Sequence, residues 1–133
     1  MKDGQILPRH FHYEKTEDII NRCGGTLCVE VWNSKPESEG YAVDYESDVT
    51  VYCDGMKVTV PAGGVVKVTN GNSITLTPYI YHRFYAEGGE LIVGEVSKVN
   101  DDAKDNHFSE ETHHSIEEDE PVRHLLCGGY VME

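Results

Sequence analysis

The feature that most constrains the fold is a regular alternation of short β-branched runs with turns rich in glycine, proline and asparagine. The clearest case is Asp54-Gly55, which separates Val49–Cys53 from Met56–Val60. This link predicts a tight hairpin, because both residues of the favoured two-residue turn need positive φ. Comparable runs occur at residues 26–33, 65–69, 73–77, 81–85, 90–99 and 122–127. Short strands at this spacing predict an all-β antiparallel sandwich or barrel.

Two segments depart from the strand pattern. Residues 16–22 favour one short helical turn, with Thr16 as its cap and Gly24-Gly25 as its end. Residues 100–121 are acidic and loop-like, and a loop of that length within a compact domain is usually functional or disordered. With 133 residues, we expect a single domain over 1–133.

Charge and cysteine usage exclude several classes of partner. The chain carries 11 basic against 24 acidic residues, for a net charge of −13, which repels both nucleic acid and anionic lipid. No apolar run is long enough to cross a bilayer, and the first residues lack the apolar region of a signal peptide. The four cysteines show no C-x-x-C spacing, so we expect reduced thiols in a cytoplasmic protein. Neutral sugars and divalent cations stay compatible with this charge.

A His-x-His pair is the first candidate site. His10 and His12 would project to the same face of an extended strand, and two converging imidazoles suit a first-row divalent ion. Glu17 offers an oxygen ligand, and His82, in another strand-like run, offers a third nitrogen. Taken alone, the His-x-His spacing could also arise by chance, with both histidines exposed to solvent.

The spacing around this pair resembles the first signature motif of the cupin superfamily. The matching residues are Gly4, His10, His12, Glu17 and Gly24. A second, looser match runs from Asn70 to His82, with Tyr79 or Ile80 at the place of a glycine in the family pattern. The resemblance implies a cupin-type antiparallel β-barrel, or jelly roll.

A longer resemblance covers nearly the whole chain. The segments HFHYEKTEDIINRCGGTL, SITLTPYIYHRFY, GEVSKVNDDAKDNHF and IEEDEP are similar to the bacterial D-lyxose isomerase family. This resemblance implies a metal-dependent aldose–ketose isomerase that interconverts D-lyxose and D-xylulose, and often D-mannose and D-fructose. It implies Mn²⁺ as the metal, with Zn²⁺, Co²⁺ or Fe²⁺ as other possibilities. The implied ligands are His10, His12, Glu17 and His82.

The implied reaction also needs a group that moves a proton between neighbouring carbons. The family places a glutamate for this in the acidic segment, where we favour Glu118 and, second, Glu117. By composition alone that segment is a solvated charge run. The resemblance puts substrate contacts near Glu95, Asp101 and Asp105, and Lys15 is a possible charge partner for Glu17.

One departure from the family concerns the region before the His-x-His strand. Family members carry a segment there with edge strands and a lysine that assists proton transfer, whereas here the first motif begins at Gly4. We therefore expect an exposed sheet edge that a homodimer would cover. Two other functions stay open: a non-catalytic cupin that binds metal and sugar, and an iron-dependent oxygenase.

Overall fold

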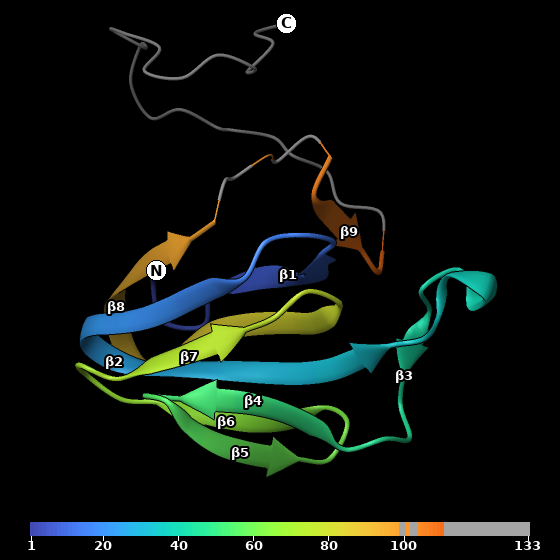
Figure 1. The fold of residues 1–133 in the computed structure, drawn as a ribbon. Coiled ribbons are helices and arrows are strands. Elements are labelled where there is room, and N and C mark those ends of the chain that lie inside the picture. The colour runs from blue at the N-terminus through green and yellow to red at the C-terminus, as the bar shows by residue number, and fades with distance from the viewer. Residues whose placement is uncertain (99–100, 102–103, 111–133) are drawn as a thin grey trace, which may run out of the picture.

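The computed structural model describes residues 1–98, 101 and 104–110, and within them the chain is almost entirely β-structure (Figure 1). The strands belong to one antiparallel sheet that folds over itself. The elements in chain order are β1 (Ile6–His12), β2 (Glu17–Ser34), the 3₁₀ turn η1 (Glu37–Glu39), β3 (Val43–Asp44), β4 (Val49–Cys53), β5 (Met56–Val60), β6 (Gly64–Val68), β7 (Ser73–Leu76), β8 (Ile80–Ser97) and β9 (Asn106–Phe108).

The long strands β2 and β8 form the frame of the fold. They pair antiparallel over their whole length, from Glu17 opposite Ser97 to Asn33 opposite Ile80. On the far side of β8 lies β1, followed by β9. The first half of β2 carries β7, β4 and β5, whereas its second half carries β6 and β3.

A sharp bend folds this two-stranded ribbon into two layers, as the returning path of β2 in Figure 1 shows. In β2 the bend lies at Gly24, where φ is +103° and a Cβ would lie 2.1 Å from the carbonyl oxygen of Glu90. In β8 it lies at Gly88-Gly89, both with positive φ. The core between the layers is built from aliphatic side chains such as Ile19, Ile74 and Val29. The expected all-β antiparallel fold is confirmed, and the architecture is consistent with a cupin-like jelly roll.

The helical turn expected at residues 16–22 is wrong, because this segment is the start of β2. Glu17, Ile19 and Asn21 are buried and alternate with more exposed neighbours, which is the period of a strand. The segment also pairs with β7 on one side and β8 on the other. The backbone groups are thus satisfied by two neighbouring strands, which overrides the local helical propensity.

Other elements expected from the sequence are confirmed, some with different first or last residues. The Asp54-Gly55 turn has positive φ at both residues and joins β4 to β5. The runs expected at 81–85 and 90–99 form one strand, β8, because Gly88-Gly89 bends the chain without ending its pairing with β2. Within the expected loop 100–121, Asn106–Phe108 forms β9, since the neighbouring strand β1 offers an unpaired edge. The strand expected at 122–127 lies outside the described residues.

Two further findings concern the chemistry of the chain. Cys23, Cys28 and Cys53 are free thiols, and Cys127 lies outside the described residues. No helix in the described part is long and apolar enough to cross a membrane.

The bend offers a first test. We expect Gly24→Ala to lower the free energy of unfolding by about 3 kcal/mol or more, because it adds positive-φ strain to a clash with the backbone of β8. Gly88→Ala is the matched control: its φ is also positive, but nothing lies within 4 Å of its Cβ, so it should cost only about 1 kcal/mol. Urea unfolding measures both. Equal losses would mean that close packing at Gly24 does not stabilise the fold.

Candidate metal centre

Three strands bring four candidate metal ligands together inside the fold. His10 and His12 lie on β1, His82 lies near the start of β8, and Glu17 is the first residue of β2. His10 is the direct cross-strand neighbour of His82 in the β1–β8 ladder. All four side chains are buried, and the ligand nitrogens of the three histidines lie within 4.8 Å of one another.

Glu17 completes the cluster from the opposite strand. Its Oε2 lies 3.4 Å from Nε2 of His12, and its Oε1 lies 3.2 Å from Nε2 of His82. The structure therefore brings together the full ligand set expected from the sequence. Three imidazoles and one carboxylate suit a first-row divalent ion such as Mn²⁺, Fe²⁺, Co²⁺ or Zn²⁺.

Backbone carbonyls fix the orientation of the three rings. Nδ1 of His10 lies 2.8 Å from the oxygen of Pro8, Nδ1 of His82 lies 3.0 Å from that of Ile80, and Nδ1 of His12 lies 3.3 Å from that of Asp105. These contacts favour the tautomer with the proton on Nδ1, so that the Nε2 lone pair of each ring is free. This is the usual arrangement of metal-binding histidines.

The cluster fits a cation on physical grounds. In this tautomer the lone pair of His82 Nε2 faces a carboxylate oxygen of Glu17, and two acceptors at that distance repel each other unless a positive charge lies between them. Among the described residues His82 Nε2 is also one of two buried side-chain atoms without a hydrogen-bond partner. A buried acceptor of this kind is costly unless it is satisfied, and a metal ion would satisfy it.

The pKa values of two ligands favour their metal-binding forms. Burial, together with the neighbouring His82, lowers the pKa of His10 to about 3, so its ring is neutral at physiological pH. Burial by itself raises the pKa of Glu17, but hydrogen bonds and positive charge from His12 and His82, when a proton is on their Nε2 atoms, outweigh burial and hold that pKa well below its ordinary range. His10 is therefore neutral and Glu17 ionised, which are the forms in which both groups bind a metal ion.

Lys15 is buried beside the cluster and bridges two carboxylates. Its Nζ lies 3.1 Å from Oε2 of Glu17 and 2.9 Å from Oε1 of Glu95. Burial alone lowers the pKa of Lys15, but the hydrogen bond to Glu95 and the charge of Glu17 outweigh it and raise that pKa. The expected ion pair between Lys15 and Glu17 is confirmed. The burial of Lys15 and its ion pair with Glu95 could not be predicted from the sequence. Two carboxylates and one ammonium leave one net negative charge to attract a cation.

Asp105 holds the segment that carries His12 and Lys15. Its carboxylate accepts hydrogen bonds from the backbone N–H of Glu14 at 2.7 Å and of Lys15 at 3.1 Å. Its backbone oxygen accepts a further hydrogen bond from the N–H of Tyr13 at 3.3 Å, beside the contact with His12. Asp105 was expected to contact substrate, but these bonds give its buried carboxylate a positioning role, and substrate contact stays a prediction.

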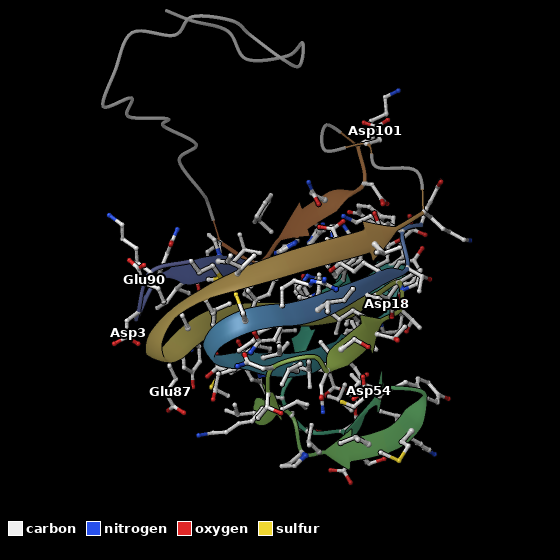
Figure 2. All side chains as sticks on the ribbon, turned by 90° about the vertical axis from the view of Figure 1, so that its left-hand side faces the viewer. Asp3, Asp18, Asp54, Glu87, Glu90 and Asp101 are labelled. Atoms are coloured by element: carbon white, nitrogen blue, oxygen red, sulfur yellow. The ribbon has the colours of Figure 1, made fainter. Side chains whose placement is uncertain are left out.

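The other expected site residues lie farther out or outside the described part. Asp101 is half exposed on the loop that leads to β9 (Figure 2), and its carboxylate lies 4.0 Å from Nζ of Lys104. Glu117 and Glu118 lie outside the described residues. One neighbour of the site had no signal in the sequence: Phe108 of β9 stacks on His10, with ring centroids 5.2 Å apart.

Tyr79 takes the place of the glycine in the second motif. Its φ is +65°, a conformation that glycine adopts freely and that costs a tyrosine about 1–2 kcal/mol. Its N–H donates to the backbone oxygen of His12 at 3.0 Å, and its ring stacks on Tyr41 with centroids 5.8 Å apart. These contacts offset the strain, so the loss of the glycine leaves the position of His82 intact.

Metal binding can be tested through stability. At a Mn²⁺ concentration 100-fold above Kd, we expect binding to stabilise the protein by about 2.7 kcal/mol, an effect that chelation reverses. His82→Ala should abolish the shift by removing a buried ligand. His107→Ala is the control, because that histidine lies outside the cluster. Thermal unfolding with and without metal measures the effect, and a full metal response in His82→Ala would exclude this ligand set.

Asp105 can be tested against Asp101. We expect Asp105→Ala to lower the free energy of unfolding by about 2–3 kcal/mol, since it leaves two backbone N–H groups without their acceptor. It should also weaken metal binding, because the segment directly after His12 loses the carboxylate that holds its backbone. Asp101→Ala should leave stability and metal affinity unchanged. A stable Asp105→Ala variant with normal metal affinity would instead favour the original expectation of substrate contact.

Comparisons with known proteins show the family of the chain. A family model described as D-lyxose isomerase matches residues 1–130. A protein of Escherichia coli O157:H7 named D-lyxose/D-mannose isomerase is 45% identical over 134 aligned positions, which cover 98% of this chain and 57% of that protein. A protein of Serratia proteamaculans with the same name is 46% identical over the same shares. The chain spans a little over half the length of these curated relatives, and it belongs to the D-lyxose isomerase family.

Proposed function

We propose that the chain is a metal-dependent aldose–ketose isomerase that interconverts D-lyxose and D-xylulose, and also D-mannose and D-fructose. The observation that carries the proposal is the buried cluster of His10, His12, His82 and Glu17, whose orientation and protonation suit a divalent ion. The names of the two relatives support the choice of sugars. We take Mn²⁺ as the preferred metal, with Zn²⁺, Co²⁺ and Fe²⁺ as alternatives.

The reaction moves a carbonyl from C1 to C2 of the sugar, so a proton must leave one carbon and return to its neighbour. A divalent ion held by the four ligands would stabilise the negative charge that develops on the substrate oxygens. The chain contributes the rigid ligand set, with each imidazole held by a backbone carbonyl. Fixed ligands of this kind avoid reorganisation during the reaction.

Two groups are candidates for handling the proton. Glu118, or next to it Glu117, would take the proton from carbon and return it, and both lie outside the described residues. Lys15 is the candidate on the described side of the site, since its ammonium lies against Glu17 and Glu95. An ammonium there would donate a hydrogen bond to a substrate oxygen, and Glu95, whose side chain is 42% exposed, would contact a hydroxyl.

A non-catalytic module that binds metal and sugar is the second candidate. The observation that favours it is the same buried cluster of candidate metal ligands. Metal binding and sugar binding need only the cluster, whereas turnover also needs the proton-transfer groups in their places.

Activity separates the two candidates. We expect the whole chain, loaded with Mn²⁺, to form ketose from D-lyxose and from D-mannose. Glu118→Gln should lower kcat by roughly 100-fold or more, because it removes the proton carrier, while the metal content stays the same. Glu90→Gln, at a glutamate near the bend of β8, is the matched control (Figure 2). A colorimetric ketose assay and metal analysis measure both properties.

The results of these measurements distinguish the isomerase, the binding module and the oxygenase. Bound metal without ketose formation would favour the binding module. Unchanged turnover in Glu118→Gln would exclude that residue as the proton carrier. Oxygen consumption by the iron-loaded protein would point to an oxygenase.

A further inference from the structure

A second carboxylate shares the ammonium of Lys15 with the candidate metal ligand Glu17. Nζ of Lys15 lies 3.1 Å from Oε2 of Glu17 and 2.9 Å from Oε1 of Glu95. The side chain of Lys15 is 4% exposed and that of Glu17 is 2% exposed, whereas that of Glu95 is 42% exposed. The ammonium therefore lies between a buried carboxylate of the cluster and a second carboxylate that reaches solvent.

The pairing of β2 with β8 places the two carboxylates on the same face of the sheet. Glu17 lies opposite Ser97, and Glu95 lies opposite Ile19. Because side chains alternate along a strand, residues 17 and 19 project to one face, and Glu95 shares that face with its cross-strand partner. Glu17 and Glu95 are thus diagonal neighbours whose negative charges repel each other, and an ammonium between them stabilises both.

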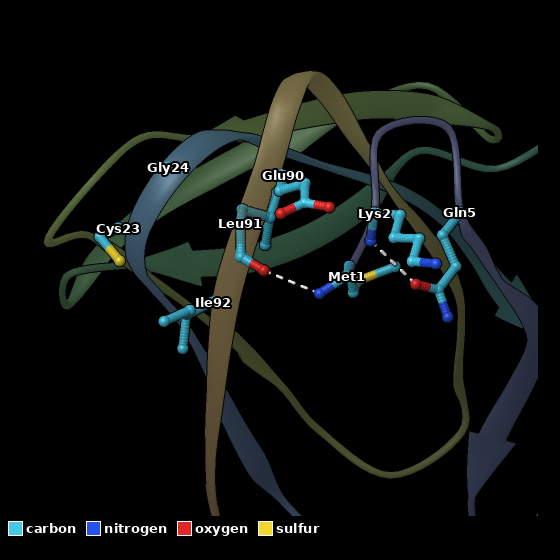
Figure 3. A pocket seen from close by; sticks show the side chains of 8 residues that line it. All are labelled: Met1, Lys2, Gln5, Cys23, Gly24, Glu90, Leu91 and Ile92. Atoms are coloured by element: carbon cyan, nitrogen blue, oxygen red, sulfur yellow. Dashed lines mark hydrogen bonds between the residues drawn. The ribbon is translucent and has the colours of Figure 1, made fainter. Parts of the chain in front are cut away.

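Backbone contacts hold both sides of this ion pair. The N–H of Lys15 donates to a carboxylate oxygen of Asp105 at 3.1 Å. On the other side, β8 pairs with β2 in an unbroken register over residues 93–97. Just after the bend, Leu91 is joined to Met1 by hydrogen bonds of 2.7 and 3.0 Å, the first of which is drawn in Figure 3. The lysine and the strand that carries its second partner are therefore both fixed in place.

A bound cation would change the surroundings of the ammonium. Glu17 would coordinate the metal ion, and the ammonium of Lys15 contacts the same carboxylate. The two positive charges would then lie close together in the interior, where little water screens their repulsion. Glu95 is placed to offset this repulsion, because its carboxylate contacts the ammonium on the side away from Glu17.

We propose that Glu95 is a positioning residue, which holds the ammonium of Lys15 at the site while Glu17 serves the metal ion. Without Glu95, the cation and the buried ammonium would compete for the single charge of Glu17, and metal affinity would fall. The inference rests on the metal-binding part of the proposed function, but not on the identity of the sugar or on turnover. A carboxylate has two oxygens, so Glu95 can also contact a sugar hydroxyl.

Two simpler roles for Glu95 predict different behaviour. If its ion pair with Lys15 were an ordinary surface contact, removal of Glu95 would leave metal affinity unchanged, since exposed pairs contribute little. If Glu95 were itself a metal ligand, its removal would weaken binding by the same factor whether or not Lys15 is present. In the proposed role the loss depends on the charge of Lys15, so a double-mutant cycle separates the three roles.

Calorimetric titration of the whole chain with Mn²⁺ supplies this cycle. Glu95→Gln should weaken Mn²⁺ binding by about tenfold or more, because metal binding would leave a buried ammonium without its second carboxylate. Lys15→Met should bind Mn²⁺ at least as tightly as the wild type, since no ammonium competes for Glu17. In the Lys15→Met background, Glu95→Gln should change the affinity by less than about threefold. Lys15→Gln supplies a second neutral background if the methionine variant does not fold.

Glu87→Gln is the matched control. Glu87 also lies on β8 and forms an ion pair, at 2.6 Å from Nζ of the exposed Lys67, but it lies near the bend (Figure 2). Its substitution removes the same charge and should leave Mn²⁺ affinity unchanged. Thermal unfolding adds a second measurement: with a chelator Glu95→Gln should lose little stability, because Lys15 keeps Glu17, whereas its stabilisation by Mn²⁺ should be smaller than that of the wild type.

Each result supports or overturns the proposal. An equal loss of affinity from Glu95→Gln in both backgrounds would overturn it in favour of a ligand, and no loss in either would reduce the ion pair to a surface contact. A wild type that binds no metal would overturn this proposal and the proposed function together. The expected cycle without ketose formation would support the role of Glu95 and count against the isomerase alone.

Discussion

The antiparallel pairing of β2 with β8, folded at its glycine bend, is the constraint on which the rest of the structure depends. The ribbon is continuous over both strands, so the bend at Gly24 brings its two ends to the same end of the fold. One end begins with Glu17 and the other carries His82. A carboxylate and an imidazole that are far apart in the sequence thus meet, and β1 adds two further histidines through its ladder with β8. The candidate metal centre depends on this bend.

Burial explains why this arrangement favours a cation. Three imidazoles and a carboxylate would be well solvated at a surface, but in the interior their lone pairs have no water to face. The backbone carbonyls that hold each Nδ1 leave each Nε2 as an acceptor near Glu17. Lys15 supplies part of the missing positive charge, and a divalent ion would supply the rest. The same interactions that make the cluster costly without a cation therefore suit it to hold one.

The two halves of β8 serve different parts of the candidate site. The first half pairs with β1 and carries His82. The second half carries Glu95, whose carboxylate lies 2.9 Å from Nζ of Lys15 beside the cluster. One strand thus supplies a candidate metal ligand and a partner of the buried lysine.

The sequence by itself determined most of the strands, the Asp54-Gly55 hairpin and the His10–His12 pair on one strand, because alternation, turn chemistry and the His-x-His spacing are local properties. It misassigned residues 16–22 and missed β9, since in both segments pairing with a neighbouring strand decides the conformation. The burial of Lys15 between two carboxylates and the use of Asp105 as a backbone acceptor also depend on tertiary contacts. Only the folded ribbon decided these features, because they join residues whose separation in the chain exceeds the reach of any local pattern.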